Sequence, residues 1–102
     1  MTVKNINGQQ AIDSREVAEM VGKQHKHLLR NIAGYIEIME KSGEPKFGPS
    51  DFFIPSTYVS AQNKEQPCYL ITKKGCDMIA NKLTGEKGVL FTVAYVTAFE
   101  DM

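Results

Sequence analysis

A stretch of basic and amide side chains near the N-terminus has the chemistry needed to bind nucleic acid. Residues 20–36 contain no Asp or Glu. Arg pairs bidentately with guanine and Gln or Asn with adenine, whereas Lys more often meets phosphates without reading sequence. The stretch therefore predicts contacts to double-stranded DNA in which the arginine and the amides read bases and the lysines neutralise phosphate. The side chains expected at this interface are Lys23, Gln24, His25, Lys26, His27, Arg30 and Asn31.

Two helices joined by a tight turn are the elements that would position these side chains. Asp13 and Ser14 offer an N-cap to a first short helix, and Gly22 is suited to end it in the left-handed conformation. This pattern over residues 14–40 predicts a helix-turn-helix whose second helix enters the major groove N-terminus first. The alternative is an amphipathic helix pair whose polar face is simply solvated. The second helix is expected over residues 24–40, with an apolar face formed by Leu28, Leu29, Ile32, Ile36 and Met39.

Two β-hairpins are expected on either side of this helix pair. Asn7-Gly8 is a two-residue turn signal for the first hairpin. The second hairpin is expected to be broken or bulged near Pro55. Its exposed tip is either a wing that places Lys64 on the DNA backbone or a plain solvent-exposed turn. The expected segments are a hairpin at residues 3–12, a loop at 41–50, strands at 52–59 and 68–71, and an exposed turn at 60–66.

Two helices are expected at the C-terminal end of the chain. Thr72 can cap a helix from residue 73 to about 83, and a second helix is expected from about residue 86 to the end. Apolar residues between Val89 and Phe99 surround almost the whole circumference of this last helix, which points to a central helix or to a subunit interface. As an interface, it would join a homodimer that places two recognition helices on DNA half-sites about one helical turn apart.

Composition limits both the fold and the partners. A chain of 102 residues with 42% hydrophobic and 24% charged residues suits one globular domain over residues 1–102. The patterns predict an α+β, winged-helix-like fold, with the helix-turn-helix at 14–40, short antiparallel strands within 52–71 and two C-terminal helices within 73–101. The formal net charge of zero argues against binding nucleic acid by charge alone and leaves local contact with DNA open. We find no apolar stretch that could span a bilayer and no signal peptide, so we expect a cytoplasmic protein with no membrane partner.

The sequence contains no recognisable catalytic or metal-binding pattern. Cys68 and Cys76 match no metal or redox spacing and are expected to be buried free thiols. His25 and His27 are two residues apart, so on a helix they point in different directions and do not form a chelating pair. We expect these imidazoles to face solvent or phosphate. No nucleophile elbow, phosphate loop or metalloprotease motif is recognisable, so we expect no cofactor, no metal and no enzymatic activity.

Two runs of the chain resemble the Rha family of phage regulatory proteins. In the first run, Ser14, Val17 and Ala18 are followed by the basic and histidine segment and then by Leu28-Leu29 and Ile32. The resemblance extends over residues 11–102 and implies a regulator of phage or prophage origin with an antirepressor-like architecture. It also implies that the family's basic and histidine positions in the second helix are Lys23, His25 and Arg30. The second run comprises residues 53–58, 69–75, 84–87 and 95–100.

Two functions from different classes remain open. The leading hypothesis is a transcriptional regulator that binds double-stranded DNA through its helix-turn-helix. The alternative is an antirepressor-like module that captures a phage repressor or inhibits another host protein that works on nucleic acid. The zero net charge and the apolar last helix are compatible with this second function as well.

Overall fold

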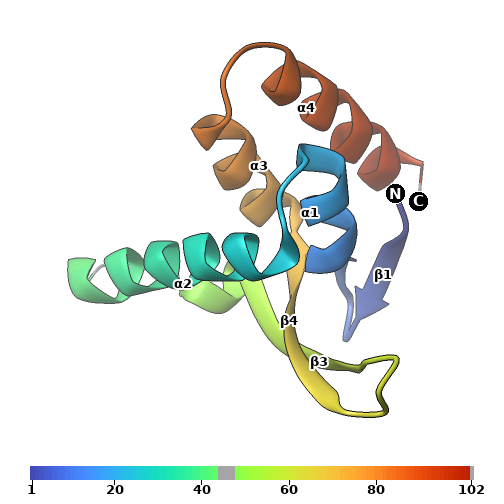
Figure 1. Cartoon of the computed structure of the whole chain (residues 1–102). Helices are drawn as coiled ribbons and strands as arrows, with labels where there is room; N and C mark the ends of the chain where they lie inside the picture. The colour runs from blue at the N-terminus through green and yellow to red at the C-terminus, as the bar shows by residue number, and fades with distance from the viewer. Residues whose placement is uncertain (44–47, 102) are drawn as a thin grey trace.

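The computed structural model describes residues 1–43 and 48–101. These residues form an α+β fold with four α-helices and one four-stranded antiparallel sheet, in the strand order β1-β2-β4-β3 (Figure 1). The elements are β1 (Val3–Ile6), β2 (Gln9–Asp13), α1 (Ser14–Val21), α2 (His25–Ser42), the 3-10 turn η1 (Pro49–Asp51), β3 (Phe53–Val59), β4 (Glu65–Thr72), α3 (Lys73–Lys82) and α4 (Gly85–Glu100).

The first hairpin forms as predicted and is part of a larger sheet. Asn7 and Gly8 have φ angles of 52° and 84°, so both residues adopt the left-handed conformation that a tight two-residue turn requires. Strand β2 then pairs with β4, with Ala11 opposite Thr72 and Asp13 opposite Leu70. This pairing joins the two predicted hairpins into one sheet and brings the start of α1 onto β4.

The predicted break at Pro55 is wrong. The register of β3 with β4 runs without interruption from Phe53 opposite Ile71 to Val59 opposite Glu65. Near the tip, the Ser60 N–H donates to the Lys64 carbonyl at 2.8 Å, which fixes the hydrogen-bonded positions of the ladder. In this register Pro55 occupies a position whose nitrogen points away from β4, so the strand loses no ladder bond. Strand β4 also begins earlier than predicted, at Glu65 instead of Cys68.

The helices follow the predicted order with small differences at their ends. The Asp13 side chain caps α1, and Gly22 ends it at a φ angle of 72°, with its N–H directed to the last carbonyls of the helix. Helix α2 continues through Gly34 and extends to Ser42, into the segment predicted as a loop. Of that loop, residues 44–47 lie outside the described residues, and η1 occupies part of the remainder.

The core lies between the helices and the sheet. Both cysteines are buried and free, as predicted. Helix α4 buries one face only, so the expected central helix is wrong and the alternative of a subunit interface stays a prediction. Its outer residues Val89, Leu90 and Val93 are 63%, 52% and 60% exposed. The core residues include Ile12, Val17, Val21, Leu28, Ile32, Phe53, Ile71, Cys76, Ile79, Phe91 and Tyr95.

Candidate nucleic-acid interface

The turn between α1 and α2 holds the start of α2 at the surface. The Lys23 N–H donates to the Ala18 carbonyl at 2.9 Å, which closes the turn after Gly22. Gln24 precedes α2, and its side chain makes no capping hydrogen bond, so the amide is not committed to the helix end. Leu28 and Ile32 are buried on the inner face of α2. The opposite face is thereby turned to solvent over the first turns of the helix.

The outer face of the first two turns of α2 carries basic side chains that form no ion pair within the described residues. Lys23 also belongs to this surface, and its ammonium donates to Asn31 Oδ1 at 3.1 Å. In the described part of the chain, the ion pairs involve other residues, so no carboxylate neutralises this surface. Of the predicted contact residues here, the structure places five at the surface: Lys23, Gln24, Lys26, His27 and Arg30, with Asn31 half-buried beside them.

His25 differs from the other predicted contact residues because its ring is already engaged within the protein. Its Nε2 atom lies 2.8 Å from Ser14 Oγ, and its ring meets the Tyr58 ring edge-on at a centroid distance of 6.0 Å. Burial lowers the pKa of this imidazole below its ordinary value of 6.5, an effect that the nearby Asp13 charge partly offsets. The sequence could not indicate this orientation, because Ser14 and Tyr58 are remote from His25 along the chain.

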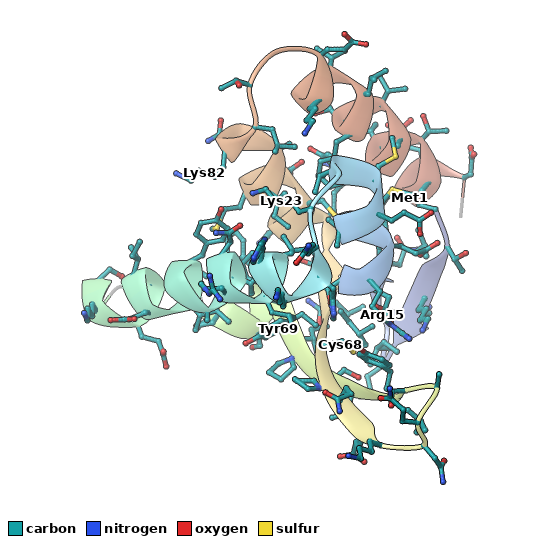
Figure 2. The ribbon with its side chains drawn as sticks, in the orientation of Figure 1. Met1, Arg15, Lys23, Cys68, Tyr69 and Lys82 are labelled. Carbon is teal, nitrogen blue, oxygen red and sulfur yellow. The ribbon has the colours of Figure 1, made fainter. Side chains whose placement is uncertain are left out.

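Tyr58 connects the second hairpin to the start of α1. The Arg15 guanidinium lies 4.0 Å above the Tyr58 ring, a cation–π contact. The same guanidinium donates to both carboxylate oxygens of Asp13, at 3.1 and 2.8 Å. Burial opposes ionisation of Asp13, but the hydrogen bonds and charge of Arg15 outweigh it and lower the pKa of the carboxyl below 3.8. Figure 2 shows Arg15 and Cys68 in the region where the hairpin leaves the helices.

Lys64 belongs to a different part of the surface from the α2 residues. It is exposed at the tip of the β3–β4 hairpin, which projects away from α3 and α4 (Figure 1). Its neighbour Asn63 has a φ angle of 60°, the left-handed geometry of a tight turn. The fold presents Lys64 to solvent on an arm separate from α2. A ligand would have to contact both elements to use it together with Arg30.

Lys87 lies beside this surface and was not predicted. A Cβ atom built on Gly22 would lie 3.5 Å from Lys87 Nζ, so the ammonium sits against the α1–α2 turn. Helix α1 has no basic residue in its last turn, and Lys87 brings a positive charge to that negative helix end from α4. No local pattern could reveal this position, because α4 reaches the turn only through the tertiary fold.

Two other kinds of site lack support in the described residues. Across residues 1–43 and 48–101, no group of three or more His, Cys, Asp or Glu side chains is arranged to hold a metal ion. In the same residues, we find no helix with the length and hydropathy required to cross a membrane.

Comparison with known proteins shows which family the chain matches. The family model described as phage regulatory protein Rha matches residues 12–102. The chain is 52% identical over its full length to the "SPbeta prophage-derived putative antirepressor protein YoqD" of Bacillus subtilis (strain 168), of which it covers 39%. It is 29% identical over 99 residues, 95% of its length, to an uncharacterized protein of Haemophilus influenzae, of which it covers 55%. The chain thus spans about half or less of the length of each of these two relatives. No solved structure matches it.

Proposed function

Because the chain belongs to the family of the phage regulatory protein Rha, we propose that it is a phage or prophage regulator that binds double-stranded DNA through α1 and α2 acting as a helix-turn-helix. The β3–β4 hairpin serves as a wing, so the domain over residues 1–102 is of winged-helix type. The protein acts in the cytoplasm of the bacterial host and works by binding, without a cofactor or an enzymatic step.

The observation that carries this proposal is the unpaired basic face of α2. Lys26 and Arg30 are exposed one turn apart on the same side of the helix, opposite the buried Leu28 and Ile32. A free positive face on the first turns of a helix suits a major groove, whose walls are phosphates and whose floor displays base edges.

Each side chain has a role that follows from its chemistry. Lys26 meets a phosphate, and Lys23 keeps donors for another phosphate beyond its bond to Asn31. Arg30 binds guanine, while Gln24 and Asn31 are suited to adenine. His27 is exposed and adds a donor to base or phosphate, and Lys64 contacts the backbone from the hairpin tip. His25 has a different role, described below.

The proposal includes a homodimer through α4. Val89, Leu90 and Val93 form a continuous exposed apolar face at successive turns of that helix. The α2 surface of one copy offers few cations for phosphate, namely Lys23, Lys26 and Arg30. A second copy packed on this face would cover the apolar side chains and double those contacts on a two-half-site operator.

The test is a titration of fluorescent duplex DNA by anisotropy at several salt concentrations. Lys26→Ala is expected to weaken binding to all sequences and to reduce the log-log salt slope by about one, the loss of one phosphate contact. Arg30→Ala is expected to cost about 1–3 kcal/mol and to relax the preference for one base pair. Lys74→Ala is the matched control, because Lys74 is an exposed lysine on a different helix, α3.

A folded wild-type protein that binds no duplex even at low salt would contradict the DNA-binding proposal. The second candidate would then take its place. The SPbeta relative's name describes an antirepressor, and this name favours capture of a phage repressor or of another host protein. In that case the triple variant with Lys23, Lys26 and Arg30 changed to Ala would still co-purify with the repressor of the same prophage.

A further inference from the structure

The buried hydroxyl of Ser14 is hydrogen-bonded to the imidazole of His25. Ser14 is fully buried and has two hydrogen-bond partners in the described structure, the Tyr69 N–H at 3.0 Å and His25 Nε2 at 2.8 Å. The Tyr69 N–H can only donate, so the Ser14 oxygen accepts from it. Buried hydroxyl groups are rarely left without an acceptor, and His25 Nε2 is the acceptor that remains for the Ser14 proton. The imidazole is therefore neutral and carries its own proton on Nδ1.

This bond lies where the start of α2 meets three other elements. Ser14 begins α1, Tyr69 belongs to β4, and the ring of His25 rests edge-on against Tyr58 of β3. Arg15 also lies over the Tyr58 ring. The imidazole thus links the first residue of the proposed recognition helix directly to α1 and β3, and through Ser14 to β4.

We propose that neutral His25 is a positioning residue, which fixes the first turn of α2 relative to the β3–β4 hairpin so that both elements present one surface to DNA. His25 does this without touching DNA. The inference rests on the proposed DNA-binding function. It assigns a different role to His25 from the exposed side chains around it, because its ring faces the protein.

The positioning role predicts an unusual response to acid. A histidine that contacts phosphate gains affinity when it is protonated. Protonation of His25 would instead remove the acceptor for the Ser14 proton and add a charge near Arg15. The other groups around it are Asp13, whose charge favours the protonated ring, the ring of Tyr58, and the buried Cys68 thiol on β4 near Asp13 and Arg15. DNA affinity is therefore expected to fall as pH decreases below about 6.5, because the pKa of His25 is lowered from its ordinary value.

The experiment uses a His27→Gln background, so that His25 is the one histidine left in the 102-residue sequence. In that background, His25→Leu is expected to weaken duplex binding by about tenfold, the scale of one lost buried hydrogen bond, with an unchanged salt slope. His25→Gln can still reach Ser14 and is expected to restore most of the affinity and to abolish the acid response. Lys26→Gln is the contrasting control, because it should lower the salt slope.

Three results would overturn the positioning role. They are wild-type affinity in His25→Leu, a reduced salt slope in that variant, and tighter binding at low pH that disappears in His25→Gln. Imidazole ¹⁵N shifts of the wild-type protein provide a measurement that needs no DNA, since an unprotonated Nε2 is expected at neutral pH. If the wild type binds no DNA, the proposed function fails by itself. The positioning role then depends on these shifts and on whether Ser14→Ala and His25→Leu lower Tm non-additively.

Discussion

Gly75 occupies a position at which the fold leaves no room for a methyl group. A Cβ atom there would lie 2.2 Å from the Phe52 carbonyl oxygen and 2.7 Å from Ile71 Cγ2. The Gly75 N–H also donates to the capping Thr72 hydroxyl at 3.2 Å, which ties the residue to the start of α3. Gly75→Ala is expected to lower the free energy of unfolding by about 1–3 kcal/mol or more, because backbone must move. Urea denaturation measures this loss.

Gly34→Ala is the matched control for that substitution. Gly34 lies within α2, and a Cβ atom there would meet nothing within 4 Å. Alanine is the better helix former, so this variant is expected to gain up to about 1 kcal/mol. Equal losses in the two variants would contradict the clash at Gly75 and would indicate that both glycines are needed for another reason.

The pH dependence of stability follows from His25 and Asp13. The pKa of His25 is lowered from 6.5 in the folded protein, so the unfolded chain binds more protons just below that pH. Stability is therefore expected to fall as pH drops from about 6.5 through the folded pKa of His25. The lowered pKa of Asp13 gives a second fall below about pH 3.8. The check is the urea midpoint measured at a series of pH values between about 6.5 and 3.8. The fall in stability that begins near pH 6.5 should be absent in His25→Gln and present in His27→Gln.

At the scale of elements, α4 contributes a cation to the turn between α1 and α2. Lys87 lies against Gly22, next to Lys23, and forms no ion pair in the described part of the chain. We expect Lys87→Gln to weaken DNA binding and to lower the salt slope by up to about one, because a phosphate beside the turn would lose its partner. Lys82→Gln, on the neighbouring α3, serves as the control. An unchanged salt slope in Lys87→Gln would mean that Lys87 contacts no phosphate and acts only on the C-terminal end of α1.

The elements themselves were largely predictable because their signals are local. Asn7-Gly8, Gly22 and Thr72 each act within a few residues, and the first hairpin, the end of α1 and the start of α3 form where they indicate. The pairing of β2 with β4 was not predictable, because Ala11 and Thr72 lie far apart in the sequence. The bulge expected at Pro55 was wrong because the effect of a proline depends on which side of the strand its nitrogen faces.

The residue types of the candidate site could be predicted from the sequence, but the positions of its side chains could be predicted only in part. A segment without acids was sufficient to indicate the exposed Lys26 and Arg30. The inward orientation of His25 and the approach of Lys87 arise from tertiary contacts with Ser14, Tyr58 and Gly22, for which the sequence carries no local pattern.

At the scale of the whole molecule, the α4 face predicts self-association. Val89 and Val93 are both at least 60% exposed, one turn apart. Light scattering coupled to size exclusion is expected to show a dimer, and Val93→Glu is expected to give a folded monomer with weaker operator binding, since a charge at the seam repels its copy. Val59→Glu is the control for self-association alone, because Val59 is 65% exposed on the hairpin and lies outside α4. A wild-type monomer at high concentration would remove the dimer.

The outer edge of the sheet limits what can attach to the hairpin. Strand β3 is an edge strand, and an edge offers free N–H groups that can hydrogen-bond to a strand of another molecule. Pro55 lies in the middle of that edge, with its nitrogen on the outer side in the observed register. It therefore removes a donor that an incoming strand would need. The hairpin can extend from the protein toward a partner while Pro55 disfavours edge-to-edge strand pairing with another chain.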